Sequence, residues 1–205
     1  SLTVTPAFAA VPAYDPVKDF VPTSTVSIVP IMLVTHPSLP VRTAQDFITL
    51  AKARPNAITM ASAGTGSNGH LTGELFQVIT GVKLTHVPYK GSGPGLTALL
   101  SGELHFMFPS TGSANPLLKS GKLRGLGVSG PKRSPVFPDL PTIAESGVAG
   151  YEANNWWALA APAGTPPAVI AKLSGELTRY LKLPETVKRF EAEGAEVDIR
   201  TPSEV

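Results

Sequence analysis

Ala61-Ser-Ala-Gly-Thr-Gly-Ser-Asn-Gly-His70 joins two segments of different hydrophobic periodicity, and this junction indicates the fold class. The apolar residues at 58–61 predict a strand, and the pattern over 67–79 predicts a helix that Ser67 caps. The glycines between them let the backbone turn tightly and approach a ligand closely. A strand, a glycine-rich turn and a helix in this order predict an α/β fold.

The same order of elements repeats along the middle of the chain. Glycines follow each predicted helix, at the positions where helices commonly end. Because strands and helices alternate with short links, the pattern predicts a parallel sheet covered by helices on both faces. Further strands are predicted over 84–87, 104–108 and 123–128, and further helices over 94–100 and 113–119.

Two longer apolar stretches flank this region and predict strands. The first, 26–34, contains Pro30, which lacks an amide hydrogen, so this strand should lie at a sheet edge or cross between domains. The second, 151–161, carries Trp156 and Trp157. This pair can supply an aromatic wall for a ligand, or one can pack in a core while the other covers a domain seam.

Three local signals predict helix starts. Thr43 with Asp46, and Thr142 with Glu145, have the spacing of a capping box, the second one opening a short helix after a loop over 130–141. Pro167 stands where the first turn of a helix tolerates proline. The apolar residues expected on one face of that last helix are Val169, Ile170, Leu173, Leu177 and Leu181.

The composition excludes several classes of function. The 205 residues carry a net charge of +2 without a basic cluster, which argues against a nucleic-acid groove. The absence of cysteine removes thiol nucleophiles, disulfides and cysteine-based metal sites. The longest apolar run is far short of the roughly 20 residues that a membrane helix needs. Histidines and acids show no metal-ligand spacing, so neither a metal nor a cofactor is expected.

The glycine-rich turn is the segment that carries chemistry. Unpaired amides at a helix start, together with the helix dipole, attract an anion, and the carboxyl end of a parallel strand is where α/β sheets bind ligands. The spacing Gly64-x-Gly66-x-x-Gly69 also matches a dinucleotide fingerprint, but no acid follows the next strand, where Lys90 could face a 2′-phosphate. The residues alone leave open a carboxylate or other small anion, a nucleotide, and a purely structural turn. His70 fits either a ligand donor or a polar residue without a role.

Six segments, in the same order along almost the whole chain, resemble the Bug/TctC family of extracytoplasmic solute receptors. These receptors belong to tripartite tricarboxylate transporters. The segments are Val-Thr-His-Pro-Ser-Leu-Pro at 34–40, Ser-Ala-Gly-Thr-Gly-Ser-Asn-Gly-His-Leu at 62–71, His-Val-Pro-Tyr-Lys-Gly-Ser at 86–92, Gly-Lys-Leu-Arg-Gly-Leu at 121–126, Phe-Pro-Asp-Leu-Pro-Thr at 137–142 and Ala-Pro-Ala-Gly-Thr-Pro at 161–166.

The resemblance implies a periplasmic-binding-protein-like (type II) fold with two lobes, two hinge strands and the ligand in the cleft between the lobes. Residues 1–34 and 155–205 would be parts of lobe 1, and 35–154 would form lobe 2. Relatives begin with a strand and a Pro-Phe-x-x-Gly-Gly loop that have no counterpart here. The chain is therefore expected to be truncated at both ends, with the N-terminal portion of lobe 1 missing.

The resemblance also implies a function without catalytic residues: a monomeric periplasmic receptor that captures a small organic carboxylate and presents it to membrane transporter subunits. Where many relatives have Asp-Asn, this chain has Ser110 and Thr111, which makes an amino-acid ligand less expected. The alternatives are an NADP-dependent oxidoreductase and an orphan sensor receptor. The predicted ligand-binding residues are Ser62, Ala63, Gly64, Thr65, Gly66, Ser67, His70, Tyr89, Ser110, Thr111 and Trp156.

Overall fold

The computed structural model describes residues 3–201 and 204. The chain divides into two units. Unit 1 takes in the residues before Pro30 and those from Trp156 onward, and unit 2 is Pro30–Asn155. The chain passes between the units twice, at the end of strand β1 (Phe20–Pro30) and at the start of strand β7 (Asn154–Pro162). Pro30 therefore stands at a crossing between units, one of the two places predicted for it.

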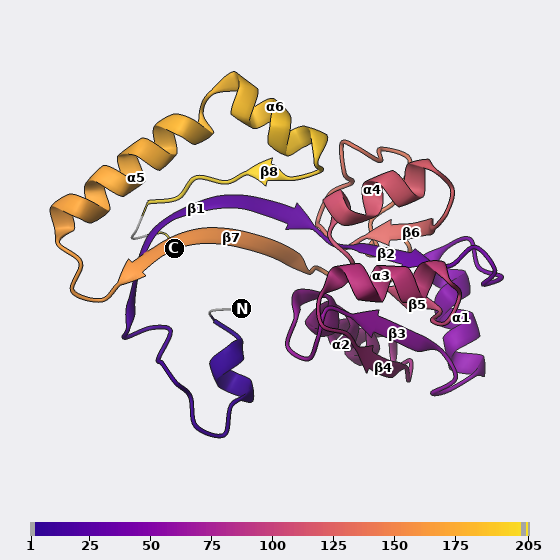
Figure 1. Ribbon diagram of the computed structural model, residues 1–205. Helices are drawn as coiled ribbons and strands as arrows, with labels where there is room; N and C mark the ends of the chain where they lie inside the picture. The colour runs from indigo at the N-terminus through magenta and orange to yellow at the C-terminus, as the bar shows by residue number, and fades with distance from the viewer. Residues whose placement is uncertain (1–2, 202–203, 205) are drawn as a thin grey trace. The chain divides into compact units, whose positions relative to one another are not determined.

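Unit 2 is built around a mixed sheet, and its elements all lie within the described residues. Its strands are β2 (Met32–Thr35), β3 (Thr59–Ser62), β4 (Thr85–Pro88), β5 (Phe106–Met107) and β6 (Arg124–Val128). Its helices are α1 (Ala44–Ala53), α2 (Asn68–Thr80), α3 (Ser92–Leu100) and α4 (Thr111–Lys119). The strands are ordered β4-β3-β5-β2-β6 (Figure 1).

The four strands predicted for the parallel sheet, β3 to β6, run in one direction, as predicted. β3 pairs parallel with β4 and β5, and β6 runs the same way, because β5 and β6 both pair antiparallel with β2, which lies between them. The chain enters unit 2 along β2 directly from β1, so this strand is not preceded by a crossover helix that would force a parallel direction. The single strand predicted over 26–34 is correspondingly two strands, interrupted at Ile31, which bridges to Ser110 instead.

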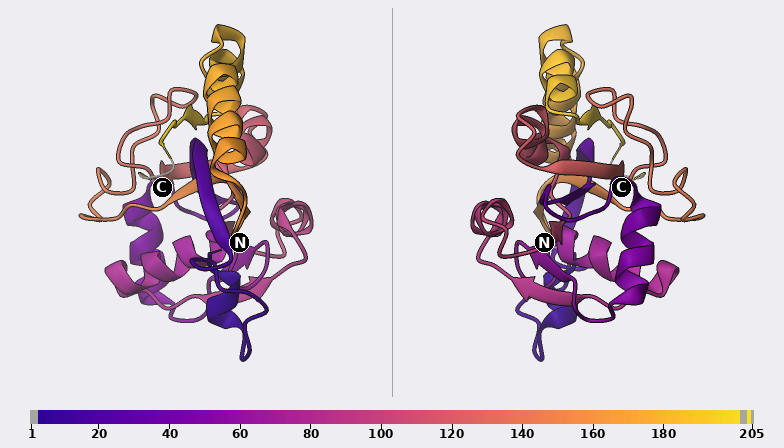
Figure 2. Two further views of the ribbon diagram at one scale, coloured as in Figure 1. Left: turned by 90° about the vertical axis from the view of Figure 1, so that its left-hand side faces the viewer. Right: turned by 90° about the vertical axis from the view of Figure 1, so that its right-hand side faces the viewer.

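Helices cover both faces of this sheet, as the alternation predicts. Successive strand residues point to opposite faces, so Met60 belongs to one apolar core and Ala61 to the other. The first core contains Phe47 of α1 and Phe76 of α2, and the second contains Leu99 of α3. Figure 2 shows α1 and α2 on one side of the strands, with α3 and α4 on the other.

Both predicted capping boxes form, but the second one does not open a helix. The Asp46 amide donates to Thr43 Oγ1 at 3.0 Å at the start of α1, and the Thr43 amide donates to Asp46 Oδ2 at 3.1 Å. The same reciprocal pair joins Thr142 and Glu145, with distances of 2.8 and 2.9 Å. There the backbone makes turns and no regular helix. The Val128 amide of β6 donates to the Pro141 carbonyl, the Ile143 amide donates to the Val128 carbonyl, and Thr142 forms a parallel bridge with Val128, which ties the segment to the sheet.

Unit 1 contains a sheet in the order β7-β1-β8, with β8 (Glu196–Val197) antiparallel to β1. Its helices are the short 3-10 turn η1 (Thr5–Phe8), α5 (Pro167–Leu181) and α6 (Pro184–Ala192). The predicted apolar face of α5 is partly wrong. Ile170 and Leu181 are buried, whereas Val169 and Leu173 are 45% and 41% exposed. Among the described residues, no helix is both long and apolar enough to cross a membrane.

Candidate functional site

Three helices of unit 2 begin at one edge of the sheet. α3 follows β4, α2 follows β3 and α4 follows β5, and these strands are neighbours that run in the same direction. Their carboxyl ends, and the helix starts that follow them, therefore lie together. In these three helices, all within the described residues, the first turn contains no acidic residue. The positive ends of three helix dipoles are left uncompensated at this edge, which favours an anion.

The start of α2 leaves amides available. Ser67 caps the helix, with its Oγ 3.4 Å from the amide nitrogen of His70. The amides of Asn68 and Gly69, in the first turn, have no hydrogen-bond partner among the described residues. The same holds for the amides of Ala63 and Thr65 in the preceding loop. These four groups are the backbone donors that this segment can offer a ligand.

Other amides of the loop are already bonded within the protein. Gly64 donates to Ser62 Oγ at 3.1 Å, and Gly66 donates to Nδ1 of His70 at 3.1 Å. The Ser67 amide donates to the carbonyl of Gly64 at 3.0 Å. These bonds give the loop one defined shape, so the remaining amides point from a rigid frame.

A buried network lies under the loop. Ser62 is fully buried, and its Oγ is 2.6 Å from Nε2 of His86. The rings of His86 and His70 stack with centroids 4.1 Å apart and an angle of 25° between their planes. Because Nδ1 of His70 accepts from Gly66, its Nε2 carries the proton in the neutral ring and faces Glu74 Oε1 at 3.6 Å. The ring of His70 therefore joins Gly66 of the loop to Glu74 of α2.

The histidines also make stability depend on pH. Burial lowers the pKa of His86, and the positive charge of a protonated His70 lowers this pKa further, against a smaller opposing effect of Glu74. Burial also lowers the pKa of His105, whose Nδ1 accepts from the Thr59 amide. Both side chains are therefore more easily protonated in the unfolded chain, where a histidine titrates near pH 6.5.

We expect the free energy of unfolding to be highest above about pH 6.5 and to decrease as the pH falls from 7 to 5. Denaturant unfolding at several pH values between 5 and 7 measures this free energy. Asp46 and Glu145, whose pKa values are lowered, change the stability mainly below pH 5. His86→Gln should flatten the dependence, whereas the matched control His36→Gln should keep it. Stability that rises on acidification, or an unchanged slope in His86→Gln, would contradict this assignment.

Of the remaining predicted site residues, Tyr89 and Ser110 lie at this edge of the sheet, whereas Thr111 has a structural role and Trp156 belongs to unit 1. Tyr89 follows β4, donates its amide to the Ser62 carbonyl at 3.0 Å and is joined to the loop in this way. Ser110 caps α4 at the same edge. The hydroxyl of Thr111 is buried and donates to the Pro30 carbonyl at 2.7 Å, so this side chain already has a structural role. Trp156 belongs to unit 1, where it is 51% exposed.

Three contributors are not among the site residues predicted from the sequence. His86 is one of them, and strand register places it beside Met60, two residues from Ser62. The start of α3 was placed at Pro94, but the helix begins at Ser92, so its start at the same edge was overlooked. Gly91, the N-cap of α3, is a signal that could have shown it, since glycine is among the residues preferred at that position. Asn68 was also missed; its side chain bonds to Asn155.

Comparison with known proteins gives one family and several close relatives. A family described as "Tripartite tricarboxylate transporter family receptor" matches residues 1–202. Protein BugT of Bordetella pertussis is 38% identical over 191 residues, which are 93% of this chain and 59% of BugT. The chain thus spans a little over half the length of this curated relative.

Two solved structures share the fold over nearly the whole chain. "R. palustris Rpa4515 with adipate" has a TM-score of 0.93 and 36% identity, covering 99% of this chain and 68% of that chain. MatC (Rpa3494) from Rhodopseudomonas palustris with bound malate has a TM-score of 0.85 and 31% identity, covering 96% and 65%. The predicted fold class, α/β of the periplasmic-binding-protein type, is confirmed by this agreement.

Proposed function

The chain belongs to the receptor family of tripartite tricarboxylate transporters, and we propose that it is a periplasmic receptor for a small organic carboxylate. In this proposal it delivers the ligand to the membrane subunits of such a transporter. It acts as a monomer and without catalytic residues. As the alternative, the same receptor would bind a signalling protein instead of a transporter. Identifying the membrane protein that it binds distinguishes the two.

The observation that carries the proposal is the edge of unit 2 where three helices begin. A carboxylate at this edge would meet the open amides of Asn68 and Gly69 and the positive ends of α2, α3 and α4. A neutral ligand would gain no comparable stabilisation, because the dipole effect acts on charge. The ligands printed for two similar structures, adipate and malate, are both dicarboxylates and support the same class.

The dinucleotide alternative has less support. The glycine spacing does lie between a strand and a helix, as that motif requires. An NAD-type site also needs an acid at the end of the next strand to bind the ribose. β4 ends at Pro88 and is followed by Tyr89 and Lys90, so that acid is replaced by an aromatic and a basic residue.

Closure of two lobes on the ligand is part of the proposal. In this proposal one lobe consists of residues 1–34 and 155–205, and the other of residues 35–154. The hinges of the closing motion would then be the two crossings at β1 and β7. A ligand that binds the closed state more tightly would shift the population toward that state.

A thermal-shift screen of mono-, di- and tricarboxylates, followed by calorimetry, tests the proposal. We expect saturable binding of at least one acid, no binding of its amide counterpart, and a smaller radius of gyration in small-angle scattering with the acid bound. NADP serves as the comparison ligand and should not bind. Saturable micromolar NADP binding, or equal affinity for an acid and its neutral amide, would overturn the assignment.

A further inference from the structure

Unit 2 contains a cavity that is separate from the edge described above. Its volume is about 510 Å³, within the range of small-molecule sites. Thr35 pairs with Phe106, where β5 begins, and with Arg124, where β6 begins. The cavity therefore lies at the amino ends of these strands, whereas α2 and α4 begin at the carboxyl ends of β3 and β5. A ligand in it would be independent of the proposed carboxylate receptor site.

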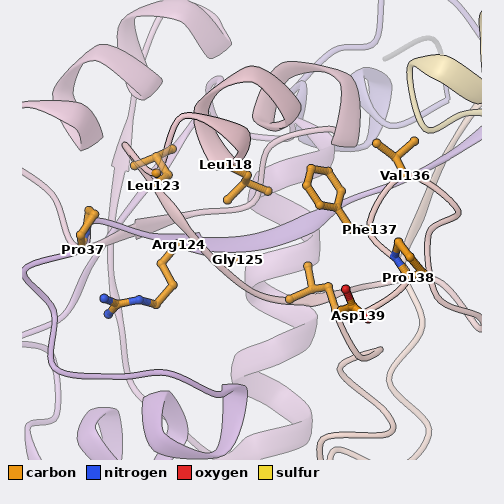
Figure 3. Close-up of a pocket in the computed structure, with 11 residues that line it drawn as sticks. Pro37, Leu118, Leu123, Arg124, Gly125, Val136, Phe137, Pro138 and Asp139 are labelled. Atoms are coloured by element: carbon orange, nitrogen blue, oxygen red, sulfur yellow. The ribbon is translucent and has the colours of Figure 1, made fainter.

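The cavity is apolar along most of its length and cationic at one end. Gly125, on β6, has no side chain; a Cβ there would lie 3.1 Å from Leu140 and 3.5 Å from Leu118. Figure 3 shows Arg124 near Pro37 at one end of the group of lining side chains, and Phe137 toward the other. The lining residues are Pro37, Leu118, Gly121, Leu123, Arg124, Gly125, Val136, Phe137, Pro138, Asp139 and Leu140.

Arg124 is held in place but not neutralised. Its Nη1 donates to the carbonyls of Leu39 at 3.2 Å and Val41 at 2.8 Å. Its Nε and Nη2 make no hydrogen bond within residues 3–201 and 204, and no carboxylate there forms an ion pair with it. A half-buried guanidinium with free donors in a fixed position is suited to bind a carboxylate.

The other charged residue of the lining limits the ligand further. Asp139 is exposed, and Figure 3 shows it beside Phe137, away from Arg124. A second negative charge on the ligand would be repelled there, whereas an apolar tail could pack against Phe137. We propose that this cavity is a second binding site, for a small monocarboxylate with an apolar body whose carboxylate pairs with Arg124.

Three probes of equal chain length test the site: hexanoate, 1-hexanol and adipate. Each is titrated into the ¹⁵N-labelled chain, and the amide shifts of Gly125 and Phe137 are followed. We expect saturable shifts with hexanoate and at least tenfold weaker binding of hexanol and adipate at these amides. Equal affinity for hexanol and hexanoate would overturn the role of Arg124. Shifts confined to residues 62–69 would overturn the second site while leaving the first one supported.

A pair of variants sharpens the test. Arg124→Gln removes the charge and should weaken hexanoate at least tenfold without changing the binding of hexanol. Arg54→Gln, at an exposed arginine that ends α1, is the matched control and should bind hexanoate as the parent chain does. Unchanged hexanoate affinity in a folded Arg124→Gln would contradict the proposal. If that variant does not fold, the affinities of the parent chain for hexanoate and hexanol still test whether the site recognises a carboxylate.

Discussion

Replacing Gly64 with leucine is expected to lower carboxylate affinity by about a hundredfold or more, the equivalent of roughly 2.7 kcal/mol. Gly64 has φ = +128°, a conformation that costs a residue with a side chain on the order of 1–3 kcal/mol. A Cβ at this position would also lie 3.2 Å from the carbonyl oxygen of Tyr89, a backbone atom that cannot rotate away. The loop would have to move, and the open amides of Ala63 and Thr65 would move with it.

Calorimetry with an acid from the carboxylate screen measures this loss. Gly175→Leu is the matched control, because Gly175 lies in α5 with open space around its Cβ position and should leave affinity unchanged. Affinity retained in a folded Gly64→Leu would remove this loop from the binding site. It would leave the fold and the family membership untouched.

Replacing Gly69 with alanine is expected to destabilise unit 2 by about 2 kcal/mol, within the usual cost of overpacking a close contact. A Cβ on Gly69 would lie 2.6 Å from the carbonyl oxygen of Phe108, at the end of β5. Since that oxygen belongs to the backbone, α2 would have to shift away from the sheet. The shift would also displace the first-turn amides that we assign to the ligand.

Hydrogen exchange of amides in unit 2 measures this effect. Tryptophan fluorescence would not, because both tryptophans, Trp156 and Trp157, belong to unit 1. Gly175→Ala is the control and should stabilise α5 by up to about 1 kcal/mol, since alanine is the better helix former. A Gly69→Ala chain at least as stable as the parent would show that α2 does not pack this closely on the sheet.

Local signals in the sequence were reliable where the interacting residues are close along the chain. The caps at Ser67 and Thr43 each join a side chain to an amide three residues later, so a few letters suffice to specify them. The box of Thr142 and Glu145 shows the limit of such signals. Its hydrogen bonds form as predicted, yet the pairing of Pro141 and Thr142 with β6 holds the segment in turns.

Long-range pairing decided what the sequence pattern left open. The antiparallel direction of β2 depends on Val34 meeting Met107, residues that no local pattern relates. The stacking of His70 on His86 likewise follows from the register between β3 and β4. Burial of α5 also depends on which elements pack against it. Its hydrophobic pattern therefore predicted a wider buried face than the structure has, since Val169 and Leu173 are exposed.

The amino-acid sequence by itself determined the strand, loop and helix around Gly64–Gly69, because glycine conformations and helix caps depend on neighbouring residues. It also indicated the family, through six short segments in order. Only the folded structure decided which amides of that loop are open, since Gly64 and Gly66 donate to Ser62 Oγ and to Nδ1 of His70, and the His86 ring that contacts Ser62 comes from the neighbouring strand β4. A backbone donor is available to a ligand when the folded chain supplies no acceptor of its own, and that depends on contacts in space.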